Sequence, residues 1–321
     1  MLLPALALIA GLVLLVYAAD RFIAGAAISA HYLGVSSMVI GLVIIGFGTS
    51  APEMVVSAVA SLRGNSELAL GNAVGSNITN TSLVLGIGIL VSPLLVSSET
   101  VKRELPLLIA VTVLVFLLML DGRQSRIDGF ILLTAMVVVT LWLGWLGMRA
   151  GDSPDSLREH VRQELAVDMS KPVALGWLFF GVVMLPLASN LMVYGATEIA
   201  YYFGVSEVVV GLTIVALGTS LPELAAAVAS AVKKEHDLLL GNIVGSNLFN
   251  LLGVLGISAS IHPYRLPVRF LEYDYLFMAL VTLGFTGLSW WYVREQKVLN
   301  RPIGTMLLLC YGAYMAWLAS R

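Results

Sequence analysis

Apolar residues form long runs along the chain, and short polar or turn-forming segments separate these runs. A helix needs roughly 20 apolar residues to cross the hydrocarbon core of a bilayer, so each run predicts one membrane-spanning helix. The pattern predicts ten such helices, at Leu2–Ala30, Ser36–Leu62, Glu67–Leu90, Glu104–Leu120, Ile127–Met148, Pro172–Tyr202, Glu207–Val232, Asp237–Ile261, Tyr273–Val293 and Pro302–Ala319.

One connection between these helices is much longer than the others. It extends from Arg149 to Pro172, carries charges of both signs and contains no recognisable motif. We interpret it as a solvated connector at residues 149–171, which separates a first half at residues 1–148 from a second half at residues 172–321. Each half then contains five predicted helices.

Composition agrees with this pattern. The 321 residues are 59% hydrophobic and 12% charged, and the mean hydropathy is +0.92. A soluble domain has about 25% charged residues. The single cysteine excludes intrachain disulfides and thiolate metal clusters. The sequence therefore predicts an all-α integral membrane protein with many spans.

Lysine and arginine are divided unevenly between the alternating loops. Cytoplasmic loops of membrane proteins carry the excess of these residues. The set of loops that includes the long connector contains eleven lysine and arginine residues, and the other set contains six. This bias predicts that the connector is cytoplasmic and that both termini lie outside.

Two segments separated by 170 residues share an unusual sequence. Between Gly41–Gly86 and Gly211–Gly256, 20 of 46 positions are identical without a gap. GTSAPE recurs as GTSLPE, and GNAVGSNITN recurs as GNIVGSNLFN. Because each half has an odd number of predicted helices, the second half starts from the opposite side of the membrane. Transporters with such inverted repeats bind their substrates near the midplane, between the repeats.

A proline interrupts each copy of the first motif. Pro52 and Pro222 have no backbone N–H, so the carbonyls of Gly48 and Gly218 lose their usual donor. We expect the second, third, seventh and eighth predicted helices to be kinked or broken here, because opened backbone in a membrane is tolerated when it faces a cavity. The hydroxyls on the same turns are those of Thr49, Ser50, Thr219 and Ser220.

A glutamate follows each proline directly. A carboxylate near the bilayer centre costs about 2.5–3.5 kcal/mol on insertion scales, and such residues usually have a function. A structural role, with the carboxyl protonated or hydrogen-bonded in the core, is the alternative. The presence of Glu53 and Glu223 at equivalent positions of the two repeats favours a binding role.

The asparagine-rich motif adds amide and hydroxyl oxygens. Its serine and its last asparagine are four residues apart and share one helix face, and we interpret Asn80 and Asn250 as ligands. Small and amide residues also hold membrane helices together without any ligand, and that explanation fits Asn72 and Asn242 best. The other polar residues that both copies of the motif share are Ser76, Ser246, Asn77 and Asn247.

These groups together form an oxygen-only set with two carboxylates and no histidine or cysteine. Such a set selects hard cations, and flexible coordination by six to eight oxygens suits Ca²⁺ better than Mg²⁺. Na⁺ ions can compete for the same oxygens, which is all that exchange requires. The motifs contain no lysine or arginine, which argues against an anionic substrate.

The same residues are compatible with two other classes of function, an ion channel and an intramembrane hydrolase. A channel could use the same ligands, but rings of ligands around a pore usually come from several subunits. An intramembrane hydrolase could use Ser50 or Ser220 as nucleophile, but it needs a positioned base. The four histidines lie outside the motifs, so we expect no enzymatic activity and no cofactor.

The doubled motif resembles the calcium/cation antiporter superfamily, specifically the sodium/calcium exchanger branch with its paired alpha repeats. The resemblance covers almost the whole chain. It implies ten helices and alternating access, in which the first and sixth helices slide over a core that contains the site. It implies exchange of Ca²⁺ for Na⁺ without a nucleic-acid partner. It places ligands at Glu53, Thr49, Ser50, Ser76, Asn80 and the Gly46 carbonyl, and at Glu223, Thr219, Ser220, Ser246, Asn250 and the Ala216 carbonyl.

The chain departs from the family pattern at one position. Some members carry aspartate where this chain has Asn250, so the site here has one acid fewer, and coupling to H⁺ or K⁺ is an alternative to Na⁺. The large regulatory loop of animal exchangers is absent. We expect a multi-pass protein of a prokaryotic inner membrane, as a monomer, with an oligomer as the alternative.

Asp20 and Arg21 lie next to each other within the first predicted helix. We interpret them as a local ion pair near the inner interface, with the arginine extending toward water. A gating role is the alternative.

Overall fold

The computed structural model describes residues 2–33, 35–64, 66–149, 169–203, 216–267 and 269–320. Most of the long connector, and the first part of the helix expected at Glu207–Val232, lie outside these ranges. The elements of the first half are α1 (Leu2–Leu33), α2 (Ser37–Val39), η1 (Ile40–Ile45), α3 (Gly46–Leu62), α4 (Ser66–Ile78), η2 (Thr79–Val84), α5 (Leu85–Val91), α6 (Ser98–Lys102), α7 (Glu104–Met119), β1 (Arg123–Gln124) and α8 (Arg126–Arg149).

The second half repeats much of this order. Segments labelled η are π-helical in both halves. The elements are α10 (Lys171–Tyr202), α12 (Ala216–Thr219), α13 (Leu221–Val232), α14 (His236–Phe249), η5 (Asn250–Val254), α15 (Leu255–Ile261), β2 (Tyr264–Arg265), η6 (Leu271–Tyr275), α16 (Leu276–Arg294) and α17 (Arg301–Ala319).

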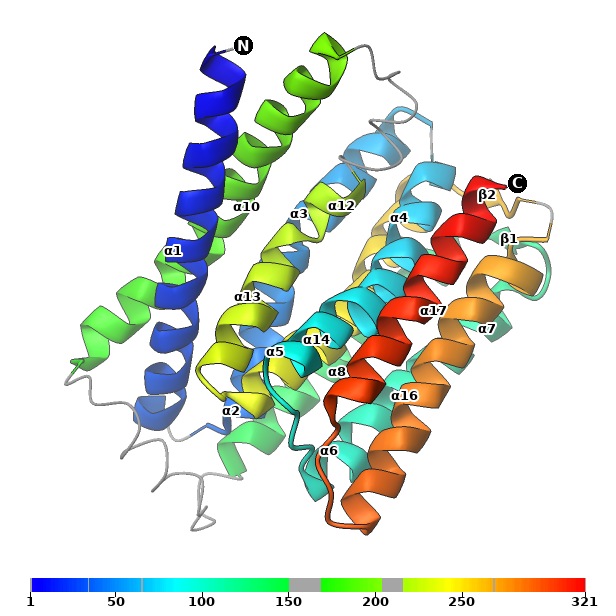
Figure 1. The fold of residues 1–321 in the computed structure, drawn as a ribbon. Helices are drawn as coiled ribbons and strands as arrows, with labels where there is room; N and C mark the ends of the chain where they lie inside the picture. The colour runs from blue at the N-terminus through cyan, green and yellow to red at the C-terminus, as the bar shows by residue number, and fades with distance from the viewer. Residues whose placement is uncertain are drawn as a thin grey trace.

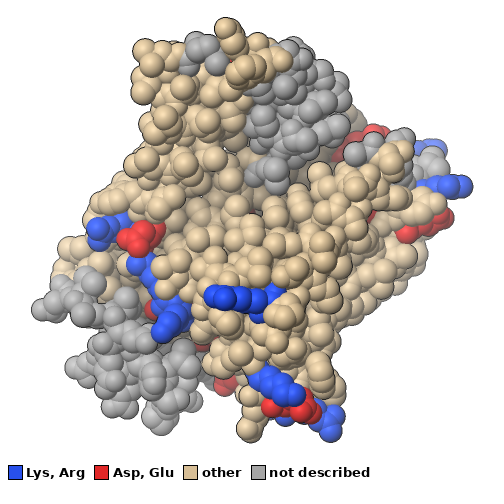
Figure 2. Space-filling model, viewed as in Figure 1, with Lys and Arg blue, Asp and Glu red and all other residues tan. Residues whose placement is uncertain are grey.

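The helices are those of a multi-pass membrane protein. Within the described residues, seven helical segments are long and apolar enough to cross a membrane. Large apolar side chains such as Leu3, Phe179 and Leu309 are exposed, whereas the segment His236–Ile261 is buried along its apolar window. Figure 2 shows a broad uncharged surface on which charged residues occupy only a few patches. A surface that is mostly apolar, with few charged residues, suits a protein whose outer surface contacts lipid.

The helices form a layered bundle (Figure 1). The long helices α1 and α10 lie side by side at one edge and pack mainly against each other. Helices α16 and α17 lie at the opposite edge. Between these edges are α3, α4, α13 and α14, which carry most of both copies of the two motifs, and the remaining motif residues lie on or next to the adjoining α12, η2 and η5.

Close contact between α3 and α14 joins the two repeats. A Cβ atom placed on Gly46 would lie 2.9 Å from the Cα of Gly245, a distance that real Cβ atoms essentially never show. Glycine therefore allows the two backbones to meet here, as small residues do in many membrane helix pairs. This contact brings the first motif of one repeat against the asparagine-rich motif of the other.

Of the expected kink or break at Pro52, the break is not present. Helix α3 continues through the proline from Gly46 to Leu62, and the irregular backbone lies before it, in the π-helical η1. A proline removes only one N–H donor, and neighbouring helices help to preserve the helix around it. In the second half the helix is interrupted at Ser220, between α12 and α13, so that Pro222 lies in the first turn of a new helix.

Candidate cation site

The two motif glutamates are buried in the centre of the bundle. Glu53 on α3 is 0% exposed and Glu223 on α13 is 1% exposed. Neither forms an ion pair with any residue that the structure describes. Both side-chain oxygens of Glu53, and Oε2 of Glu223, also have no hydrogen-bond partner. A buried carboxylate without compensation is strongly unfavourable, so these groups require a cation or a proton.

A serine connects the two acidic helices. Ser50 lies three residues before Glu53 on α3, and its Oγ donates a hydrogen bond to Glu223 Oε1 at 3.3 Å. The structure therefore brings together the two acids that are 170 residues apart in sequence.

Two asparagine side chains add to the carboxylate oxygens that accept no hydrogen bond. Asn80 on η2 and Asn250 on η5 are 1% and 0% exposed, and Oδ1 of each has no partner. Together with the two free oxygens of Glu53 and one of Glu223, this makes five buried, unpartnered oxygens from four proposed ligands. Carboxylate and amide oxygens are the ligands that Ca²⁺ prefers.

Hydroxyl groups of the two repeats bond to one another beside these acids. Thr49 Oγ1 lies 3.1 Å from Oδ1 of Asn242, to which it donates, and 3.2 Å from Ser246 Oγ. Both hydroxyls also lie 3.4 Å from the carbonyl oxygen of Gly46. Asn242 in turn donates to the Glu223 main-chain carbonyl at 3.2 Å. The Gly46 carbonyl, Thr49, Ser246 and Asn242 thus form one buried hydrogen-bond network that extends to the main chain of Glu223.

The matching residues of the other repeat are arranged differently. Asn72 donates to Ser57 Oγ at 3.3 Å, whereas its repeat partner Asn242 takes part in the network around Glu223. Ser76 is buried, and Thr219 is half-buried on α12, which begins at Ala216. Ser220 is buried at the start of α13. The structure is therefore asymmetric where the sequence is nearly symmetric.

The carbonyl of Gly218 has a partner, contrary to the expectation that Pro222 frees it toward a cavity. Ser189 Oγ on α10 donates to this carbonyl at 2.5 Å. The equivalent residue of the first half, 170 positions earlier, is Ala19, which has no hydroxyl. The repeat pattern therefore gave no indication of Ser189.

In the part of the chain that the structure describes, acidic, histidine and cysteine side chains do not form a larger cluster. Among the described residues, no group of three or more of them could hold a metal ion. The candidate site therefore depends on two carboxylates supplemented by neutral oxygens.

Comparison with known proteins identifies the family. Residues 3–145 and 173–319 match the family described as sodium/calcium exchanger protein. The chain belongs to this family. It is 41% identical over 320 residues to the inner membrane protein YrbG of Escherichia coli K12, covering 99% of this chain and 97% of the relative. It is also 41% identical over 320 residues to the putative antiporter CaxA of Alkalimonas amylolytica, covering 100% of both.

A solved structure of the family has the same fold. The sodium-calcium exchanger NCX_Mj, soaked with 10 mM Na⁺ and 10 mM Sr²⁺, superposes with a TM-score of 0.84 at 28% identity, and the match covers 98% of each chain. The resemblance inferred from the doubled motif is therefore confirmed.

An ion pair links the first helix of this exchanger-family protein to its core. Asp20 Oδ1 on α1 lies 2.6 Å from Nζ of Lys233 at the end of α13, and its other oxygen lies 3.8 Å from Arg21 Nε. The Arg21 guanidinium lies 5.4 Å from the ring centroid of Tyr17 and 5.5 Å from that of Trp177. The expected local pair is present, but the closer partner of Asp20 is distant in sequence. Exposed pairs of this kind add little stability.

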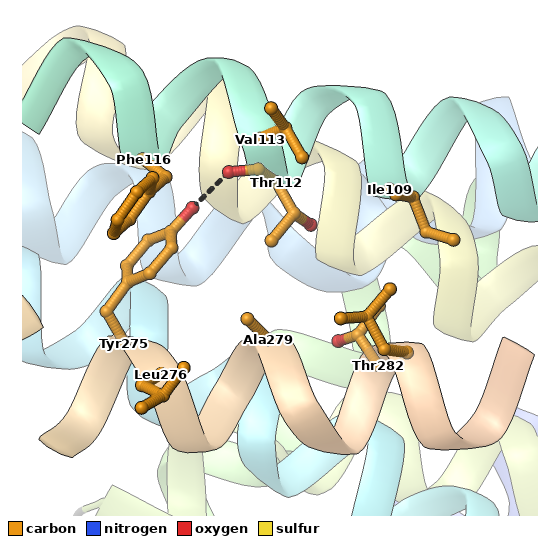
Figure 3. A pocket seen from close by; sticks show the side chains of 9 residues that line it. Ile109, Thr112, Val113, Phe116, Tyr275, Leu276, Ala279 and Thr282 are labelled. Carbon is orange, nitrogen blue, oxygen red and sulfur yellow. Dashed lines mark hydrogen bonds between the residues drawn. The ribbon is translucent and has the colours of Figure 1, made fainter. Parts of the chain in front are cut away.

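A cavity at the edge of the bundle opposite α1 is apolar. It has a volume of about 190 Å³ and lies between α7 and α16 (Figure 3). Its two threonine hydroxyls, of Thr112 and Thr282, bond carbonyls of their own helices at 2.8 and 2.9 Å. Tyr275 donates to the main-chain oxygen of Thr112 at 2.6 Å. With these hydroxyls satisfied and no charged residue in its lining, the cavity is not suited to a cation.

The two repeat-related asparagines should respond differently to alanine substitution. Asn242→Ala removes the acceptor for Thr49 and the donor to the Glu223 backbone, so we expect weaker Ca²⁺ binding. Asn72→Ala removes only the contact with Ser57, so we expect a lower melting temperature and unchanged Ca²⁺ affinity. A buried group left unpaired costs about 1–3 kcal/mol. Thermal unfolding and Ca²⁺ titration of both variants test this, and equal effects on affinity would contradict it.

Proposed function

We propose that the protein is a secondary active antiporter that exchanges Ca²⁺ for Na⁺ by alternating access at a midplane site. The observation that carries this proposal is the set of five buried oxygens without donors, which both repeats contribute and which includes two uncompensated carboxylates. Two negative charges balance one Ca²⁺, and family membership supports the same conclusion.

The proposed ligands come from four helical segments. Glu53, Glu223, Asn80 and Asn250 supply the oxygens that bind the ion most directly. The hydroxyls and carbonyls around them complete alternative coordination shells as the ion changes. These supporting ligands are Thr49, Ser50, Thr219, Ser220, Ser76, Ser246 and the carbonyls of Gly46 and Ala216.

We propose ten membrane-spanning helices in two inverted repeats, at residues 1–148 and 172–321. Seven long apolar segments supply seven crossings. The apolar helices α7 and α17 and the interrupted α12–α13 segment supply the other three. An even number of crossings agrees with the start of α1 and the end of α17, which lie at the same end of the bundle (Figure 1). One chain contains the whole site, so a monomer suffices for transport.

The distribution of basic residues supports an orientation with the connector in the cytoplasm and both termini outside. A relative with 41% identity is named an inner membrane protein, which supports the same membrane for this chain. In this orientation, the Asp20–Lys233 pair lies toward the cytoplasmic side.

Asn250 limits the site to two acids, which bears on the coupling ion. If three Na⁺ replace one Ca²⁺, one net charge crosses per cycle. Moving one charge through the membrane potential is worth about 2.3 kcal/mol per 100 mV, so voltage then assists Ca²⁺ export. An antiporter coupled to H⁺ or K⁺ is the alternative. A cation channel without a counter-ion is less favoured than either antiporter.

Uptake of ⁴⁵Ca²⁺ into vesicles that contain the purified protein distinguishes these alternatives. An outward Na⁺ gradient should drive saturable uptake, and outward H⁺ or K⁺ gradients should not. Protein-free vesicles serve as the control. Uptake driven only by H⁺ or K⁺ would replace Na⁺ as the coupling ion, and flux that needs no counter-ion would show a channel.

A further inference from the structure

Three hydrogen bonds meet at Asn247, which the ligand set above does not include. Its Oδ1 accepts from Asn80 Nδ2 at 3.3 Å, and its Nδ2 lies 2.8 Å from Thr81 Oγ1, to which it donates. Its main-chain oxygen accepts from Asn77 Nδ2 at 3.2 Å. All four residues are at most 2% exposed. These bonds connect the end of α14 with the end of α4 and the start of η2, so that the asparagine motifs of the two repeats are in direct contact.

The side-chain bonds form a chain that ends at a proposed ligand. An amide has one acceptor and one donor side. When Asn80 directs its nitrogen to Asn247, its oxygen is left for a cation, and that oxygen is buried without a partner. Thr81 holds Asn247 in the place where it can accept this bond. Partners behind a ligand fix its orientation and raise its affinity.

The other repeat lacks this anchor. The residue equivalent to Thr81 is Leu251, which has no hydroxyl. Correspondingly, Asn77 donates to a main-chain oxygen rather than to a hydroxyl, and its own Oδ1 has no partner. Both side-chain polar atoms of Asn250 are also unpartnered. One difference in sequence thus accompanies the difference between an anchored amide at position 80 and an unanchored amide at position 250.

We propose that Thr81 and Asn247 are positioning residues that preorganise Asn80 for Ca²⁺, while Asn250 is the adaptable ligand of the pair. This inference rests on the proposed function, because it concerns the affinity of the same site. Preorganisation lowers the cost of ordering a ligand at the moment of binding. The anchored repeat therefore sets Ca²⁺ affinity, and the unanchored repeat adjusts to the ion that replaces it.

The test compares hydroxyl variants of the full-length protein. Thr81→Val removes the anchor and should weaken Ca²⁺ binding about 10-fold, at the low end of the 10–100-fold effects of such partners. The maximal rate of exchange should change little. Thr81→Ser keeps the hydroxyl and should restore the affinity. Ser82→Ala is the matched control, because the neighbouring Ser82 hydroxyl bonds only the Ile78 carbonyl of its own helix.

Calcium titration of purified protein and thermal unfolding without Ca²⁺ provide the two readouts. Because Thr81→Val leaves the buried Asn247 Nδ2 without its acceptor, we expect a lower melting temperature as well. A fall in Ca²⁺ affinity that occurs in Thr81→Val, is restored in Thr81→Ser and is absent from Ser82→Ala supports the inference. Leu251→Thr offers a second variant that adds a hydroxyl beside Asn77 and should tighten Ca²⁺ binding. Wild-type Ca²⁺ affinity in Thr81→Val overturns the inference and leaves the proposed function intact, and unchanged affinity in Leu251→Thr overturns the part of it that concerns Asn250. If the wild-type protein itself does not bind Ca²⁺, the proposed function fails as well.

Discussion

Replacement of Glu53 by glutamine is expected to abolish Na⁺-dependent Ca²⁺ transport in reconstituted vesicles, and so is replacement of Glu223. Each substitution leaves a single carboxylate to balance a divalent cation in a site that the surrounding helices keep away from water. Removing one partner of a buried charge pair costs about 3–5 kcal/mol, which corresponds to a loss of affinity of more than about 100-fold. Uptake of ⁴⁵Ca²⁺ measures the loss.

The same variants should remain folded. In the absence of a cation, each carboxylate is buried without a compensating charge, and a neutral amide of similar size is easier to bury. The melting temperature without Ca²⁺ should therefore stay the same or rise, while the stabilisation that Ca²⁺ adds disappears. Glu67→Gln, at an exposed position of α4, is the matched control and should transport normally. Normal transport by either site variant would refute the assignment of the site.

Gly46→Val should have the second large effect, which acts on assembly of the two repeats. The first added carbon already lies 2.9 Å from the Cα and carbonyl carbon of Gly245, and valine adds two more. Overpacking of this kind costs about 1–3 kcal/mol, and backbone on both sides leaves no flexible side chain to move. We expect a lower melting temperature and no transport, since α3 and α14 can no longer bring their ligands together.

A glycine of the same motif region provides the control for this experiment. A Cβ on Gly75 meets no heavy atom within 4 Å among the described residues, so Gly75→Ala should keep the wild-type fold. Alanine in a helix is favoured over glycine by roughly 0.5–1 kcal/mol. Size-exclusion profiles and thermal unfolding in detergent compare the two variants. A Gly46→Val protein with wild-type stability and transport would show that close contact between α3 and α14 is not required.

Much of the candidate site could be predicted because charged and amide residues are so unfavourable in a membrane. Glu53 and Glu223 had to face the inside of the bundle, and both are buried there. The repeat of these rare residues at a constant spacing indicated that the two copies meet. The family, and the helical multi-pass architecture, followed from the same pattern and are confirmed.

The interactions around the site could not be predicted in the same way. Pro52 suggested a kinked or broken helix, but α3 continues through this residue and the irregular backbone lies before it, in η1. The bond from Ser189 to the Gly218 carbonyl joins residues 29 positions apart on different helices. Asn72 and Asn242 occupy equivalent positions of the two motifs, so the sequence did not show that their hydrogen-bond partners differ.

By itself, the sequence determined which residues must lie inside the membrane-spanning bundle, and that two related halves provide them. Hydrophobicity decides this locally, because a long apolar run is stable within the bilayer, whereas a charged side chain within such a run must be kept away from lipid. Only the tertiary structure decided which oxygens accept no hydrogen bond and so remain for a cation, and which accept hydrogen bonds from neighbouring residues. That choice depends on how helices distant in sequence approach one another, and a single hydroxyl such as that of Thr81 changes it in one repeat and not in the other.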